Sequence, residues 1–81
     1  MEELSIAAAK AVGIKQTTRA LIKGRAQEVF VAADADGMLT KPVADLCKTQ
    51  GVTCTQVAAM QELGKACGIH VGAAAAAILK N

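Results

Sequence analysis

The sequence predicts one small domain of the α/β class, in which helices cover the faces of a β-sheet. Two segments have the composition of strands, Val29–Ala33 and Val52–Val57, and segments with the apolar spacing of helices alternate with them. Strands that alternate with helices form layered α/β domains. A chain of 81 residues can bury one hydrophobic core without disulfides or a metal. Residues 1–81 are therefore expected to form a single domain.

The first half of the chain is expected to contain two helices and one central strand. Apolar residues recur at helical spacing over Glu2–Lys10, which predicts the first helix. A short extended piece, Val12–Ile14, follows it. The second helix is expected over Gln16–Lys23, with Gly24 directly after its end. The run Val29–Ala33 is apolar without alternation, as expected of a strand that is covered on both faces.

The second half is expected to contain a strand between two helices. A turn at Asp34–Gly37 leads into a third helix, for which Thr40 is a suitable N-cap and Pro42 is tolerated in the first turn. The β-branched segment Val52–Val57 predicts a strand, and a fourth helix is expected over Ala59–Cys67. The positions of these two helices that are expected to face inward are Val43, Leu46, Cys47, Met60, Leu63 and Cys67.

The C-terminal segment Ala73–Leu79 can be interpreted in two ways. Its five consecutive alanines have high helix propensity. A strand between two helical layers would also need small side chains. Periodicity does not decide between helix and strand, because every position is apolar.

Charge is unevenly distributed along the chain. The net charge is only +2, but residues 10–25 contain five basic residues and no acidic one. Residues 26–63 contain five acidic and two basic residues. For a polyanionic partner, the location of charge matters more than its sum. A solvated helix face is the alternative, since lysine and arginine usually face water.

Candidate metal and catalytic sites fail on spacing. Three cysteines without a CxxC pattern and a single histidine do not make a zinc site, and buried thiols in a reducing cytosol are expected instead. The turn at Asp34–Gly37 resembles a calcium loop only faintly, because its glycine falls too early. Spacing does not align Cys67 with His70, and no carboxylate is placed to orient the pair. We therefore expect no enzyme, no metal and no other cofactor.

The ends of the chain predict a cytoplasmic protein without membrane association. Glu2 and Glu3 open the sequence, so no signal peptide is expected. The small apolar run Gly72–Leu79 is too short to span a bilayer.

The scarcity of aromatic residues narrows the possible nucleic-acid partners. The chain has no tryptophan, no tyrosine and only Phe30. Modules that bind single strands use aromatic faces to stack bases. A nucleic acid would therefore be recognised through its shape, its phosphates and its hydrogen-bonding edges.

The most distinctive segment is Gly13–Gly24. Lys15, Arg19 and Lys23 are four residues apart and share one helix face, and Gln16 lies beside them in the first turn. A cationic helix start with an amide at its tip suits a polyanion whose base edges can be reached.

Two motifs together resemble the L7Ae/L30e ribosomal protein family, and above all its short bacterial members. The first motif is Gly13-x-Lys15-Gln16-x-x-Arg19, and the second runs over Leu63–Val71 and is followed by a small-residue tail. The similarity covers essentially the whole chain. It implies a three-layer α/β/α sandwich around a mixed four-stranded sheet, in which the alanine tail is a strand. It also implies binding to kink-turn RNA, a duplex bent sharply at a bulge and flanked by tandem sheared G·A pairs.

The resemblance implies that the start of the second helix enters the RNA groove that the kink opens. Gly13 would let the backbone approach closely. Lys15 and Gln16 would bond guanine O6, N7 or nearby edges. Arg19 would reach guanine or phosphate, and Lys23 would hold phosphate further along. The archaeal form of the motif has Asn-Glu and then Lys at these positions, so Gln16 adds donors where an acid only accepts.

The second contact that the resemblance implies is the loop after Gly68. In the family this loop covers a base flipped out of the bulge, and Ile69 and Val71 would supply an apolar wall. A buried strand start is the alternative for these two residues, and an ordinary surface histidine is the alternative for His70. The complete set of expected RNA-binding residues is Gly13, Ile14, Lys15, Gln16, Arg19, Lys23, Lys65, Ile69, His70 and Val71.

The expected function is therefore that of a monomeric RNA-binding protein, associated with the ribosome or another ribonucleoprotein. It would recognise and stabilise kink-turns in ribosomal RNA, a riboswitch or a small RNA. The alternative is a protein-interaction subunit of a larger particle that uses small-residue faces and does not read RNA directly. Binding that weakens steeply with salt would distinguish RNA binding from the alternative.

Overall fold

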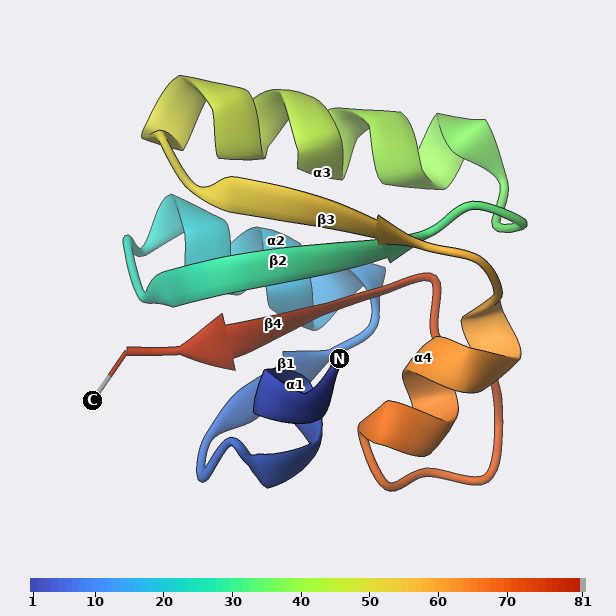
Figure 1. The fold of residues 1–81 in the computed structure, drawn as a ribbon. Coiled ribbons are helices and arrows are strands. Elements are labelled where there is room, and N and C mark those ends of the chain that lie inside the picture. The colour runs from blue at the N-terminus through green and yellow to red at the C-terminus, as the bar shows by residue number, and fades with distance from the viewer. Residues whose placement is uncertain (81) are drawn as a thin grey trace.

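The computed structural model describes residues 1–80, and its helices alternate with strands along the chain (Figure 1). The elements are α1 (Glu2–Ile6), β1 (Lys10–Val12), α2 (Ile14–Ile22), β2 (Ala26–Ala32), α3 (Gly37–Gln50), β3 (Thr53–Val57), α4 (Met60–Ala66) and β4 (Ala75–Leu79). The sheet has the order β1-β4-β2-β3. Strand β4 is antiparallel to β1 and β2, while β2 and β3 are parallel. The sheet is therefore mixed and four-stranded, as expected.

Two apolar clusters on opposite faces of the sheet make the fold a three-layer α/β/α sandwich. One cluster joins the sheet to α2 and α3, and the other joins it to α1 and α4. Figure 1 shows α2 behind the strands and α1 in front of them. Phe30 of β2 belongs to the α1/α4 cluster, whereas its neighbours Val29 and Val31 belong to the α2/α3 cluster. The central strand is thus covered on both faces, as predicted.

The alanine tail forms strand β4 between the two helical layers. Ala75 and Ala77 belong to the α2/α3 cluster, whereas Ala76 and Ile78 belong to the α1/α4 cluster. The alanines at 75–77 have no exposed surface. Burial on both faces and ladders to two neighbouring strands override the helix propensity of the run. The strand implied by the family resemblance is confirmed.

The first helix is shorter than predicted. It ends at Ile6, and Lys10 lies instead in β1, opposite Ile78 of β4. The Lys10 ammonium donates hydrogen bonds to the backbone carbonyls of Leu4, at 3.2 Å, and Ser5, at 3.5 Å. Pairing with β4 holds this segment extended, and its lysine is used to satisfy carbonyls at the end of α1.

The third helix begins earlier than predicted, and its N-cap is Asp36 instead of Thr40. The Asp36 side chain accepts a hydrogen bond from the Met38 backbone N–H at 2.9 Å. A carboxylate one turn ahead of Thr40 caps the helix first, since aspartate is among the preferred N-cap residues. Pro42 consequently lies inside the helix, one turn deeper than expected.

Strand β2 also begins earlier than its apolar run suggests, at Ala26. Its partner there is Leu79 of β4, and the register shifts between Ala26 and Glu28. No helix within residues 1–80 is long and apolar enough to span a membrane.

Candidate nucleic-acid interface

The N-terminus of α2 is open. Gly13 is its N-cap, with φ +97°, a left-handed conformation that favours glycine. Its carbonyl accepts the first helical hydrogen bond, from the Thr17 N–H at 3.0 Å. No side chain caps the helix, and its first turn holds no acidic residue. The backbone N–H groups of this turn and the positive end of the helix dipole are therefore available to an anion.

A backbone hydrogen bond places this helix start beside the beginning of β4. The Gly13 N–H donates to the Ala75 carbonyl at 2.8 Å. The loop over residues 69–71 leads into the same strand, and Ala73 is held by a 3.0 Å hydrogen bond from its N–H to the Met60 carbonyl. The two segments expected to contact RNA, the start of α2 and the loop, thus lie at the same end of the sheet.

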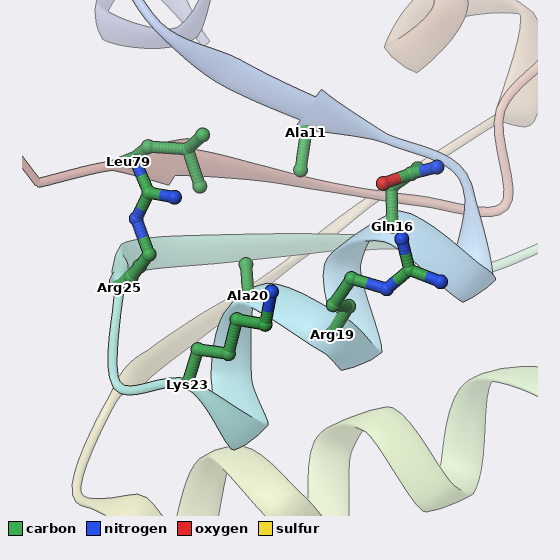
Figure 2. A pocket seen from close by; sticks show the side chains of 7 residues that line it. All are labelled: Ala11, Gln16, Arg19, Ala20, Lys23, Arg25 and Leu79. Atoms are coloured by element: carbon green, nitrogen blue, oxygen red, sulfur yellow. The ribbon is translucent and has the colours of Figure 1, made fainter.

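A shallow groove of about 100 Å³ runs along α2, and we call it the α2 groove. Four polar side chains stand around it, and three apolar ones form its floor (Figure 2). The lining residues are Ala11, Gln16, Arg19, Ala20, Lys23, Arg25 and Leu79. Within residues 1–80 the only ion pair joins Lys41 to Asp45, and neither residue lines the groove. The groove's cationic side chains are therefore not neutralised by a carboxylate.

The groove brings together three of the residues predicted from the sequence. Gln16, Arg19 and Lys23 line it together, as their helical spacing predicts. Lys15 is exposed on the first turn but does not line the groove, and Ile14 is half-buried against the α2/α3 cluster. Ile14 therefore anchors the helix start, while Lys15 and Gln16 present their side chains to solvent.

Arg25 is a groove residue that sequence reasoning missed as a site. Gly24, with φ +68°, turns the chain back after α2, so that Arg25 returns to the helix. The Arg25 N–H donates to the Ala20 carbonyl at 2.9 Å. The available signal was a basic residue directly after the helix-ending glycine.

The loop over residues 69–71 divides its apolar side chains between core and solvent. Ile69 is half-buried and packs against the α1/α4 cluster, and its N–H donates to the Gly64 carbonyl at 3.1 Å. Val71 is 70% exposed, and His70 is exposed as well. The segment is a loop and β4 begins only at Ala75, so the buried strand start is wrong. Of the two apolar residues, only Val71 is exposed to solvent.

Two glycines seat this loop on α4. A Cβ at Gly64 would overlap the carbonyl oxygen of Val71, and one at Gly72 would lie 3.0 Å from the Cβ of Met60. The close approach of the loop backbone to α4 therefore requires glycine at both positions.

Lys65 lies apart from the other expected residues. It is exposed on α4 and lines a shallow hollow with residues of α1, among them Glu2 and Ser5. Helix α4 covers the sheet face opposite α2. The structure therefore does not bring Lys65 into the α2 groove.

The cysteines lie in the protein interior or at its edge. Burial raises the pKa of the Cys47 thiol to about 12, helped by the neighbouring Cys54, and burial also raises the pKa of Cys67. Cys67 is buried while His70 is exposed. Within residues 1–80 no cluster of His, Cys, Asp or Glu could hold a metal ion.

Fold and surface together define a small α/β/α domain with an open, cationic helix start. The chain belongs to the ribosomal protein L7Ae/L30e/S12e/Gadd45 family, whose model matches residues 4–81. It is 46% identical over 78 residues to a protein of Bacillus pumilus named RNA-binding protein, covering 96% of this chain and 95% of that one. It is 52% identical over 69 residues to an RNA-binding protein of Geobacillus sp., covering 85% and 84%.

A solved structure extends the likeness to eukaryotes. The 15.5kD RNA binding protein of Giardia lamblia superposes with a TM-score of 0.88 at 26% identity, covering 99% of this chain and 68% of that one. The expected family, its short bacterial members and the expected fold class are therefore confirmed.

Proposed function

We propose that this chain binds RNA and that its target is a kink-turn with tandem sheared G·A pairs. The observation that carries the proposal is that Gln16 and Arg19 line the α2 groove together, next to a helix N-terminus that no side chain caps. The names of the relatives in Bacillus, Geobacillus and Giardia, all RNA-binding proteins, support the RNA part.

The chemistry of the site suits a bent duplex better than a straight one. An ordinary A-form helix hides its base edges in a deep, narrow major groove. A kink that opens this groove exposes guanine edges, for which the Gln16 amide and the Arg19 guanidinium are suitable partners. Preferential binding to the bent form would shift the RNA population towards it.

Val71 supports the same target from the other side of the interface. It projects an exposed apolar side chain at the same end of the sheet as the start of α2. An unstacked base that leaves a bulge exposes an apolar face, and the Val71 side chain would cover it. No aromatic ring is available for it, because Phe30 is 1% exposed.

The alternative, a protein-interaction module that uses small-residue faces, has less support. The alanines at 75–77 have no exposed surface, so they offer a partner nothing to contact.

The experiment compares three RNAs in a gel shift: a kink-turn, the same RNA with its G·A pairs converted to Watson–Crick pairs, and a straight duplex of equal length. The protein should prefer the first. Gln16→Ala should cost about 1–3 kcal/mol on the kink-turn only, the range for a base-edge contact. The matched control is Gln50→Ala, an exposed glutamine at the far end of α3.

Equal affinity of the unmodified protein for all three RNAs would contradict kink-turn recognition. A loss for Gln16→Ala that is the same on every RNA would mean that Gln16 supports only general affinity. Unchanged binding would place Gln16 outside the interface.

A further inference from the structure

Arg25 is held in place by its backbone while its side chain reaches into the α2 groove. Its N–H donates to the Ala20 carbonyl at 2.9 Å, and its carbonyl accepts from the Lys80 N–H at 2.8 Å. Figure 2 shows its guanidinium beside Leu79, at the opposite end of the groove from Gln16. These bonds fix the Arg25 backbone, so its side chain starts from a defined point at this end of the groove.

The groove concentrates positive charge over a small apolar floor. Arg19, Lys23 and Arg25 line it, and no acidic residue does. Three like charges in one groove repel one another, and an anion bound between them removes that repulsion. The floor residues Ala11 and Ala20 are short, so an anion can lie among the three cationic side chains. Guanidinium groups bind phosphate through paired N–H donors.

The ligand chemistry that fits this end of the groove is a phosphodiester backbone. The groove has no aromatic face on which a base could stack, and this end of it presents the cationic side chains of Lys23 and Arg25. From Gln16 to Lys23 the helix rises about 10 Å, at 1.5 Å per residue. An RNA whose base edges meet Gln16 would therefore present a more distant part of its backbone to Lys23 and Arg25.

We propose that Arg25, together with Lys23, binds backbone phosphates of one stem of the RNA, beyond the kinked segment. The contact of this chain with RNA then runs along the whole of α2 and into the turn that follows it. This inference rests on the proposed RNA binding, and it adds a phosphate-binding residue outside the motif Gly13–Arg19.

The test measures binding by fluorescence anisotropy over a series of KCl concentrations, with the full-length protein. Arg25→Gln should weaken binding several-fold on both the kink-turn and a straight duplex. It should lower the slope of log affinity against log salt by about 0.7–0.9, the value for one lost phosphate contact. Arg25→Lys should keep the slope of the unmodified protein. Lys48→Gln, an exposed lysine on α3 outside the groove, is the charge-matched control and should change neither quantity.

Two kink-turns, each with one stem shortened, locate the contact. The effect of Arg25→Gln should disappear on one of them and persist on the other. An unchanged affinity and slope for Arg25→Gln, with kink-turn preference intact, would overturn this inference and leave the proposed function standing. A loss without a change of slope would also overturn it. If the unmodified protein showed no preference for the kink-turn, the proposed target would be wrong. A lower salt slope for Arg25→Gln would still show that Arg25 contacts a phosphate.

Discussion

Replacing Gly64 with alanine should displace the loop that presents Val71. The added Cβ would overlap the Val71 carbonyl oxygen and would lie 3.0 Å from its carbonyl carbon and 3.2 Å from the Cα of Gly72. Non-bonded carbon atoms pack at about 3.5–4.0 Å, so the two carbon contacts alone require the loop to retreat by roughly 0.5–1 Å. The overlapping carbonyl oxygen requires a larger displacement. The obstacle is backbone on both sides, which cannot change rotamer to relieve the contact.

The expected cost follows from two opposing terms. Inserting a methyl group into a packed site costs about 1–3 kcal/mol. Alanine is better than glycine in a helix interior by up to about 1 kcal/mol. We expect a net loss of about 1–2 kcal/mol in the free energy of unfolding. For a domain of this size each kcal/mol lowers Tm by about 4–8 °C. If Val71 covers the bulged base as proposed above, binding to the kink-turn should weaken more than binding to a duplex.

Thermal unfolding followed by circular dichroism measures the first effect, and the gel shift measures the second. Gly37→Ala is the matched control, because Gly37 also lies in a helix and a Cβ there would meet nothing within 4 Å. That control should melt at or slightly above the temperature of the unmodified protein. If Gly64→Ala behaved as the control does in both assays, the loop would not be seated on α4 as described.

Two further predictions concern stability. Thr17 has no exposed surface, and its hydroxyl has no hydrogen-bond partner within residues 1–80. Thr17→Val should therefore raise the free energy of unfolding by about 1 kcal/mol, measured as a higher urea midpoint. A lowered midpoint would mean that the hydroxyl is bonded. Burial raises the pKa of the Cys47 thiol from 9.0 to about 12. The unfolded chain therefore loses this proton at a lower pH than the folded protein does, so the stability contributed by the neutral buried thiol is complete below pH 9 and is lost as pH rises towards 12. The free energy of unfolding should fall by up to about 1.4 kcal/mol per pH unit in that window for this thiol. Cys47→Ala should flatten that fall, and an equal slope in the variant would refute the assignment.

Local signals fixed several elements correctly. The end of α2 at Gly24, strand β3 and the inward stripe of α4 were predicted, because a left-handed glycine, β-branched residues and helical spacing act within a few residues. The errors concern ends that depend on distant partners. Helix α1 stops early because β1 pairs with β4, and β2 starts early because Ala26 pairs with Leu79 of the same strand.

The candidate site divides in the same way. Gln16, Arg19 and Lys23 could be grouped from their spacing, since one helix places them on one face. Arg25 and Leu79 enter the groove only through folding, because one follows a reversal of the chain and the other comes from the last strand. Neighbours in space that are distant in sequence leave no periodic trace.

The sequence by itself determined the cationic start of α2, the alternation of helices with strands and the family resemblance, because these depend on residue type and spacing alone. The tertiary structure decided what the same residues do once they are packed. Lys10 counts among the basic residues of segment 10–25, yet it bonds the carbonyls of α1 and does not line the α2 groove. The alanine tail favours a helix locally and becomes a strand, because burial between two helical layers outweighs a propensity of less than about 1 kcal/mol per residue.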